Sequence, residues 1–369
     1  MKRTLIVRYS RIGDALLVLP LIDALAKKYP DEQFTVLTNG RFEDLVELLP
    51  SNVAFISMPA RASKGMFRSV SFLIRRSVLL YKLKRRMAQF EQVAFFQYDT
   101  FDKQLHRHLM ARLPQIKVAI ADDSHFWLPE RLINKCNDGL TMIGIYKEAL
   151  SKLSYNNLHI PTDYSNTFQS RQLSSGKMLK LGLDFNKILI AFSPFSKEST
   201  KVYPLERMEI VLDYFAQLNN QYQIVILGGG AREKEQADKW VNKHPGIVSL
   251  IDEVEFIDEA VIISQCKVVL AMDSFNMHLA FFLNVPVVSV WGTTAPQNGY
   301  YPPYHSLDNV VIRNLDCQPC SMYGENGCSR EIKFECMHIA PMTIIRKIER
   351  ILQKNELTDD DGYTVREVI

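Results

Sequence analysis

Short apolar runs alternate with longer amphipathic stretches along most of the chain. The apolar runs contain almost no polar residues, which is typical of strands that are buried on both faces of a parallel sheet. We predict strands at residues 4–7, 34–37, 53–56, 93–97 and 118–121 in the first half, and at 188–192, 224–227, 248–251, 268–272, 287–291 and 310–312 in the second half. Helical patterns such as 15–28 and 42–49 lie between them. The pattern therefore predicts an α/β protein.

A polar, Ser-rich segment at residues 160–177 separates the two sets of strands and is typical of a linker. Two domains also suit a chain of 369 residues, which exceeds a typical single core. We expect a Rossmann-like domain at residues 1–165, a second one at 166–345, and at 346–369 a helix or tail that packs back toward the first domain. Because ligands of such sheets bind at the carboxyl ends of the strands, we expect the main site in a cleft between two facing domains.

Composition narrows the class of protein. A hydrophobic content of 47% with 23% charged residues is that of an ordinary soluble protein, and the net charge of +3 argues against a nucleic-acid binder. We find no signal peptide and no apolar run of the roughly 18 residues that a spanning helix needs, so we expect a cytoplasmic protein. The six cysteines are then expected to be reduced rather than paired in disulfides.

The charge is unevenly distributed. Between Leu48 and Phe90 the chain has no acidic residue and about nine Lys and Arg, interleaved with apolar side chains. Such a stretch suits an anionic membrane surface or a phosphorylated partner, although a solvated helix face would show the same pattern. The basic residues that we assign to this surface are Arg75, Arg76, Lys82, Arg85 and Arg86.

The first candidate for chemistry follows the first strand, in the segment RYSRIGDALLVLP at residues 8–20. Gly13 permits a tight turn, and Asp14 precedes a helix. A carboxylate at the carboxyl end of a strand could take a proton from a substrate hydroxyl. Asp is also a favoured helix cap, so the pair alone leaves a purely structural role open.

The second candidate is the loop after residues 188–192. It combines hydroxyl groups such as Ser196 with the ammonium groups of Lys197 and Lys201, just before a helix that begins near Pro204. Hydroxyls, loop amides and positive charge together suit a phosphate group. A solvated polar loop is the alternative.

The third candidate is the run VVLAMDSFNMHLAFF from residue 268. Asp273 ends a strand, Ser274 can cap the next helix, and His278 follows one turn later. A carboxylate there suits a sugar hydroxyl, and a hydroxyl with helix amides suits a diphosphate. A lone histidine at such a position would more often be a core residue. The glycines of VILGGGAREK at residues 225–234 suit a backbone turn near a nucleotide, but they lack the complete dinucleotide-binding pattern and suit an ordinary tight turn equally well.

These segments together resemble a known family. They are Ile12-Gly13-Asp14 with Pro20, Lys201-x-Tyr203-Pro204, the GGGA turn, DSFNMHLA at residues 273–280, Pro286-Val287-Val288 and Trp291-Gly292-Thr293. In this combination the chain is similar to the ADP-heptose:lipopolysaccharide heptosyltransferases, glycosyltransferase family 9, which have the GT-B fold. Cys317-Gln318-Pro319-Cys320 and Cys336-Met337 look like the tail of many members. The similarity is weakest at residues 57–165, where the acceptor should bind.

The resemblance implies an inverting sugar transfer from a nucleotide-diphosphate sugar, ADP-heptose, to the lipopolysaccharide core or another lipid-linked surface glycan. It implies that Asp14 is the general base and that Lys201 stabilises the departing diphosphate. The donor contacts that it implies are Ser196, Lys197, Lys201, Glu233, Asp273, Ser274 and His278. No cofactor is expected, because the chemistry needs no metal and the candidate segments contain no D-x-D motif to hold one. The acceptor implies a place at the inner face of the bacterial inner membrane.

Two features leave alternatives open. The family usually has glycine after the Asp-Ser pair, whereas this chain has Phe275, which puts the donor and to a lesser degree the activity in doubt. A non-catalytic nucleotide-sugar-binding homologue, for which Phe275 is the one hint, is therefore an alternative. A nucleotide-sugar epimerase of similar fold, which would need no acceptor and no basic membrane-facing stretch, is another. The second feature is a C-x2-C-x7-C-x7-C pattern, which suits either a zinc site or reduced thiols in a loop. Its members are Cys317, Cys320, Cys328 and Cys336.

Overall fold

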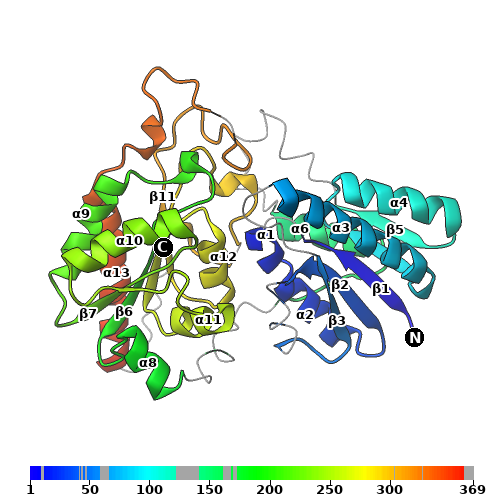
Figure 1. Cartoon of the computed structure of the whole chain (residues 1–369), viewed down its shortest axis with the longest axis horizontal. Coiled ribbons are helices and arrows are strands. Elements are labelled where there is room, and N and C mark those ends of the chain that lie inside the picture. The colour runs from blue at the N-terminus through cyan, green and yellow to red at the C-terminus, as the bar shows by residue number, and fades with distance from the viewer. Residues whose placement is uncertain are drawn as a thin grey trace. The chain divides into compact units, whose positions relative to one another are not determined.

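The computed structural model describes residues 1–9, 12–40, 42, 45, 48–58, 66–121, 141–160, 168, 173–302, 304–325 and 327–360, with only the backbone at 12, 14, 66–73, 175 and 354–360. The chain forms two compact units, Met1–Thr162 and Asp163–Ile369. Their division falls near the expected boundary at residue 165. Each unit is an α/β layer structure around its own parallel sheet (Figure 1).

The sheet of the first unit has five parallel strands in the order β3-β2-β1-β4-β5. Each lies where a strand is predicted. Their bounds are Arg3–Val7 for β1, Gln33–Asn39 for β2, Val53–Met58 for β3, Gln92–Phe95 for β4 and Lys117–Ile120 for β5. The strand order reverses direction between β1 and β4, so the carboxyl ends of these two neighbours mark the position where ligands of such sheets bind.

The helices of the first unit are α1 (Ile12–Leu16), α2 (Leu19–Lys28), α3 (Met66–Arg86), the 3-10 turn η2 (Met87–Gln89), α4 (Thr100–Arg112) and α6 (Met142–Ser151). The single helix expected at 15–28 is therefore two helices. Pro20 stands in the first turn of α2, where its missing N–H is harmless, whereas in one continuous helix its ring would clash with the carbonyl of Leu16. The helix expected at 42–49 lies mostly outside the described residues.

Helices α3 and α4 cover the same face of the first sheet (Figure 1). Leu83 of α3 and Leu105 of α4 are buried in one cluster with Val7 of β1 and Phe95 of β4. Helix α3 thus packs on the sheet through its inward apolar residues.

The second sheet has six strands in the order β11-β10-β9-β6-β7-β8, again at the predicted positions. Their bounds are Ile188–Ser193 for β6, Tyr222–Ile226 for β7, Val248–Ser249 for β8, Val268–Met272 for β9, Val287–Val290 for β10 and Val310–Val311 for β11. All pairs are parallel. The order reverses between β6 and β9, which places the binding edge of this unit at their carboxyl ends.

The helices of the second unit are α8 (Ser175–Leu181), α9 (Leu205–Ala216), α10 (Ala231–Lys243), α11 (Phe256–Ser264), α12 (Phe275–Phe282) and α13 (Pro341–Asp360), with 3-10 turns η4 (Ser199–Lys201), η5 (Pro296–Asn298), η6 (Leu307–Asn309) and η7 (Glu335–Met337). Helix α8 begins inside the segment expected to be a linker. Its N-cap is Ser174, whose hydroxyl accepts the Lys177 amide at 3.3 Å. Most of the rest of that segment lies outside the described residues.

Helix α13 packs within the second unit. Ile344, Ile348 and Ile351 are buried in one cluster with Met208 of α9 and Val268 of β9. For the described part of residues 346–369, the apolar stripe of the helix is covered by α9 and the second sheet. Residues 361–369 lie outside the described residues.

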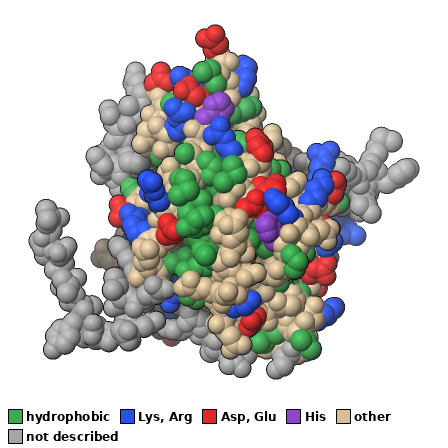
Figure 2. All heavy atoms as spheres, turned by 90° about the vertical axis from the view of Figure 1, so that its left-hand side faces the viewer, with side chains coloured by type: hydrophobic (Ala, Val, Ile, Leu, Met, Phe, Trp, Pro, Cys, Tyr) green, Lys and Arg blue, Asp and Glu red, His purple; other side chains and the backbone are tan. Residues whose placement is uncertain are grey.

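Apolar side chains also occur on the surface. On the face of the second unit that Figure 2 shows, a band of hydrophobic side chains runs between groups of charged ones. Leu179 of α8 and Ile210 of α9 are 84% and 53% exposed. Apolar exposure alone therefore does not single out a functional surface. None of the helices in the described residues combines the length and the apolar character needed to span a bilayer.

Candidate active site

The candidate site of the second unit lies where its strand order reverses. Ser193 at the end of β6 pairs in register with Ala271 of β9. The loops that follow these two strands therefore begin next to each other at the same edge of the sheet. The loop after β6 carries Ser196 and Lys201, and Asp273 directly follows β9. Sequence segments about 75 residues apart are thereby brought together, as we expected from two strand ends of one sheet.

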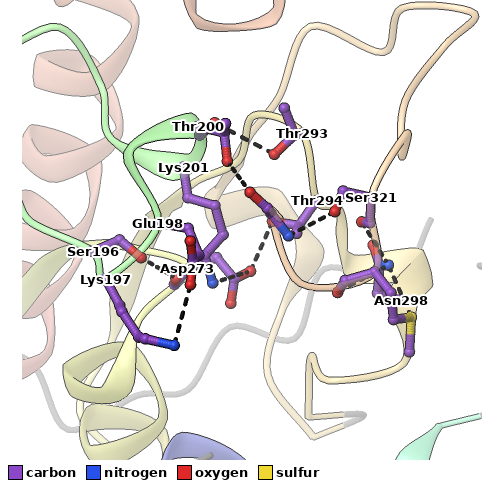
Figure 3. Close-up of polar contacts among 12 residues, drawn as sticks. Ser196, Lys197, Glu198, Thr200, Lys201, Asp273, Thr293, Thr294, Asn298 and Ser321 are labelled. Carbon is purple, nitrogen blue, oxygen red and sulfur yellow. Dashed lines mark hydrogen bonds and ion pairs between the residues drawn. The ribbon is translucent and has the colours of Figure 1, made fainter. Parts of the chain in front are cut away.

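Lys201 and Asp273 form an ion pair at the centre of this site (Figure 3). Lys201 Nζ lies 3.3 Å from Asp273 Oδ2, and the two side chains are only 14% and 13% exposed. Thr294 Oγ1 donates to the same carboxylate oxygen at 2.7 Å, and Ser196 Oγ donates to the Asp273 carbonyl oxygen at 3.1 Å. The site thus holds one partly buried positive charge whose position is fixed by a carboxylate.

The electrostatic balance keeps this pair charged. Burial alone would raise the pKa of Asp273, but the Lys201 charge, His278 and the Thr294 hydrogen bond lower it below its ordinary value. Burial, together with Lys201, lowers the pKa of His278 to about 4, although Asp273 opposes the shift. At neutral pH, Asp273 is therefore a carboxylate and His278 a neutral imidazole.

Two buried polar atoms lie beside the pair. Ser274 Oγ and His278 Nδ1 are buried, and neither has a hydrogen-bond partner among the described residues. Ser274 is the N-cap of α12, as predicted, but its side chain makes no capping hydrogen bond. Buried polar atoms are rarely left without partners, so two such atoms beside an ion pair indicate a place for a polar ligand.

A loop after β11 packs against the stem of Lys201. The Thr200 hydroxyl donates to the carbonyl of Gly324, and Gln318 Nε2 donates to the Gly292 carbonyl at 2.6 Å. Gly324 has φ +86°, and a Cβ atom there would lie 2.8 Å from Lys201 Cγ. The loop therefore touches the lysine stem at a point where only glycine fits without strain. We did not predict this contact, or that of Thr294, from the sequence.

Two of the predicted donor contacts bond to residues other than those of the ion pair. Lys197 is 93% exposed and pairs with Glu198 at 3.3 Å, so it points into solvent (Figure 3). Glu233 lies in the first turn of α10 and accepts the Gly229 amide at 2.8 Å. Burial raises the pKa of Glu233, while the Gly229 amide lowers it.

Phe275, the departure from the family pattern, begins α12. Its ring packs against Phe256 of α11, with ring centroids 5.9 Å apart and an interplanar angle of 48°. The side chain thus has an apolar neighbour on the adjacent helix.

The first unit also has a polar cluster at its binding edge, after β1 and β4. Tyr9 Oη donates to Asp99 Oδ1 at 2.7 Å, and Gln97 Nε2 donates to Asp102 Oδ2 at 3.2 Å. Burial, and then the Asp99 charge, raise the pKa of Asp102 to about 8. Burial would also raise the pKa of Asp99, but hydrogen bonds from Tyr9 and two backbone amides lower it. This cluster was not predicted.

The predicted base, Asp14, lies in the segment that follows β1. Its backbone belongs to α1, and its side chain lies outside the described residues. Gly13, which we placed with the acceptor, is half-buried in the same helix.

Of the five basic residues assigned to a membrane surface, Arg76 differs from the others. Its guanidinium pairs with Asp99 at 3.3 Å and lies 5.1 Å from the Phe101 ring centroid. Arg76 therefore points inward and is not part of the exposed basic set. The residues that remain exposed on α3 and its end are Arg75, Lys82, Arg85 and Arg86.

Among the described residues, the four C-terminal cysteines form no disulfide. Arg330 Nη1 donates to Cys317 Sγ at 3.6 Å, and the Phe334 amide donates to Cys328 Sγ at 3.3 Å. Within the described residues, no group of three or more His, Cys, Asp or Glu side chains is arranged to hold a metal ion.

Known proteins match the chain in sequence and in fold. The model of glycosyltransferase family 9 (heptosyltransferase) matches residues 141–327. The lipopolysaccharide heptosyltransferase 3 of Escherichia coli is 22% identical over 293 residues, which cover 76% of this chain and 81% of that protein.

Solved structures share the fold along almost the whole length. A glycosyltransferase family 9 structure from Veillonella parvula has a TM-score of 0.67 at 18% identity and covers 96% of this chain and 98% of its own. The E. coli ADP-heptose LPS heptosyltransferase II has a TM-score of 0.64 at 17% identity (96% and 100% covered), and the E. coli heptosyltransferase WaaC with ADP has 0.65 at 16% (95% and 99%). The fold is the expected GT-B fold, and the family model spans half of the chain. The chain therefore belongs to glycosyltransferase family 9, the heptosyltransferases.

Proposed function

We propose that the chain transfers a heptose, with inversion, from ADP-heptose to an acceptor in the lipopolysaccharide core or a related surface glycan. The observation that carries the proposal is the buried Lys201–Asp273 pair beside the unpartnered Ser274 Oγ and His278 Nδ1. The curated E. coli relative is a lipopolysaccharide heptosyltransferase, and the WaaC structure of similar fold holds ADP, which supports the choice of donor and acceptor.

The second unit is proposed to hold the donor. When the sugar–phosphate bond breaks, negative charge grows on the departing ADP, and Lys201 supplies a fixed positive charge for it. The Ser274 hydroxyl and the amide groups at the start of α12 donate to the phosphate oxygens. Asp273 can accept from a hydroxyl of the sugar or the ribose, and neutral His278 can exchange one hydrogen bond with the ligand without adding charge.

Asp14 of the first unit is proposed to take the proton from the acceptor hydroxyl. The hydroxyl oxygen attacks the anomeric carbon from the face opposite to the diphosphate, so the C–O bond forms as the bond to ADP breaks and the configuration inverts. The proton goes to the carboxylate, and ADP leaves as the anion. A carboxylate base and one ammonium group are sufficient for this sequence of steps.

The acceptor is carried on a lipid, so the proposal includes an anionic membrane surface as a partner and a peripheral place at the inner face of the inner membrane. The basic stretch of the first unit supports this part of the proposal.

The test is ADP release with and without an acceptor. ADP-heptose is incubated with the chain and with lipopolysaccharide core that lacks its heptose, and ADP and the extended core are measured. The proposal predicts ADP release and core extension only when both substrates are present. Conversion of the donor without an acceptor would indicate the epimerase alternative, and tight ADP binding without any turnover would indicate a binding protein.

A further inference from the structure

The outward face of α3 has an apolar centre. Its inward residues, such as Leu83, pack in the core, but Ile74, Val78 and Tyr81 are 58%, 46% and 58% exposed. Positions four and three residues apart lie on one side of a helix, so these three side chains form a single stripe. With Ser77 they line a shallow hollow of about 410 Å³. On a helix that is held from one side, the outward centre is ordinarily the most polar part.

Positive charge flanks this stripe. Arg75, Lys82, Arg85 and Arg86 are exposed. With 3.6 residues per turn, Arg75, Lys82 and Arg86 fall together along one edge of the stripe, and Arg85 falls within it. The Arg85 guanidinium lies 5.1 Å from the centroid of the Tyr81 ring. No acidic residue occurs between Leu48 and Phe90, so the helix has no negative charge of its own to balance this edge.

The apolar centre and the basic edge require one partner that satisfies both. A solvated face would leave the three apolar side chains in water, and a phosphorylated peptide would explain only the charge. An anionic bilayer presents phosphate groups to the basic residues and, a few ångströms deeper, acyl chains to the apolar ones. The inward Arg76, paired with Asp99 beyond β4, fastens the same helix to the binding edge of the first sheet.

We propose that the outward face of α3 docks the chain on an anionic membrane, with Ile74, Val78 and Tyr81 at the boundary between headgroups and acyl chains. This rests on the proposed function, which already includes an anionic membrane as a partner, and deepens it by naming the helix face and the apolar stripe that contact the membrane. The docking needs both kinds of residue: charge brings the helix to the surface, and the apolar stripe holds it there.

Vesicle co-sedimentation of the full chain tests the proposal. One variant replaces the stripe (Ile74→Ser, Val78→Ser, Tyr81→Ser), and a second replaces the basic edge (Arg75→Ser, Lys82→Ser, Arg85→Ser, Arg86→Ser). A control variant replaces exposed apolar residues of the second unit (Leu179→Ser, Ile210→Ser, Leu218→Ser), which are 84%, 53% and 42% exposed. Vesicles are phosphatidylglycerol mixed with phosphatidylethanolamine, or phosphatidylcholine alone, at low salt.

We expect the parent and the control to bind the anionic vesicles, and each α3 variant to bind them about tenfold or more weakly. Raising the salt should weaken parent binding, because exposed charges are screened. A stripe variant that binds like the parent, or a parent that binds phosphatidylcholine equally well, would overturn the proposal.

ADP binding measured by calorimetry distinguishes a failure of membrane docking from a failure of the proposed function. An α3 variant that loses vesicle binding but binds ADP like the parent is folded and supports docking. If instead both α3 variants lose ADP binding, the single substitution Val78→Ser replaces them. It must still weaken vesicle binding, and docking is rejected if it does not. A parent that binds vesicles but never transfers sugar would contradict only the proposed function.

Discussion

The Lys201–Asp273 pair is the residue-scale feature on which the donor site depends. The Lys201 side chain is 14% exposed, and its ammonium group lies 3.3 Å from the carboxylate of Asp273, which accepts a hydrogen bond from Thr294. Such a pair contributes little net stability, because removing two charges from water offsets most of their attraction. The pair instead fixes the position of a positive charge at the site where we propose that an anionic ligand binds.

Lys201→Ala should weaken ADP binding and slow transfer together, because the ammonium meets a diphosphate whose charge grows in the transition state. One lost charged hydrogen bond costs about 1.5–3 kcal/mol, or roughly 10- to 100-fold. Steady-state kinetics and ADP calorimetry measure the two effects. Lys197→Ala is the matched control, since Lys197 is in the same loop but 93% exposed, and it should change neither quantity. Equal effects of the two variants would move the phosphate contact elsewhere in the loop.

Asp102 predicts a pH dependence of stability. Its folded pKa of about 8 lies above the unfolded value of about 3.9, so the folded chain binds more protons between these values. The free energy of unfolding should therefore lose a contribution as pH rises through this window, at up to about 1.4 kcal/mol per pH unit. Asp102→Asn does not titrate. Urea unfolding at pH 5 and pH 8 should show the variant gaining stability relative to the parent at the higher pH, and parallel changes would show that Asp102 does not titrate there.

Sequence reasoning found the residues that stand at strand ends, because the end of a buried apolar run is visible in the pattern. Asp273, Ser196 and Lys201 were predicted for this reason, and the structure brings them together. Thr294 and Asp99 were missed, because only the strand order shows which loops share an edge.

At the scale of elements, buried strands were the most predictable part. A run such as β9, with all five residues buried, can hardly be anything else between two helical patterns. The division of one expected helix into α1 and α2 depended on a single proline, and the packing of α13 depended on a partner helix about 130 residues earlier. Local pattern contains little information about either.

The loop that contacts Lys201 gives an element-scale prediction. Gly324→Ala should lower ADP affinity and reduce stability by about 1–3 kcal/mol, because the backbone has φ +86° and the new methyl group would lie 2.8 Å from Lys201 Cγ. Gly327→Ala in the same loop is the control, since a Cβ there meets nothing within 4 Å. Thermal unfolding and ADP calorimetry measure both variants. If the two variants behave alike, the loop does not position the lysine.

At the scale of the whole molecule, length, a Ser-rich segment and repeated strand–helix alternation were sufficient to predict two α/β units. The family resemblance then predicted the type of reaction, and it predicted the donor in the second unit and the acceptor in the first. The acceptor side was the least predictable, since its sequence is least like the family and its polar cluster depends on β1 and β4 lying side by side.

The proposed transfer requires a donor site in the second unit and a general base, Asp14, in the first. Replacing Asp14 by Asn tests it most directly, with ADP release measured in the presence of ADP-heptose and the acceptor, and ADP affinity measured separately. We expect unchanged ADP affinity and a transfer rate that is lower by a factor of about 10²–10⁴, the usual contribution of a general base. A variant that transfers heptose at the parent rate would contradict the proposal and leave Asp14 with only a structural role in α1.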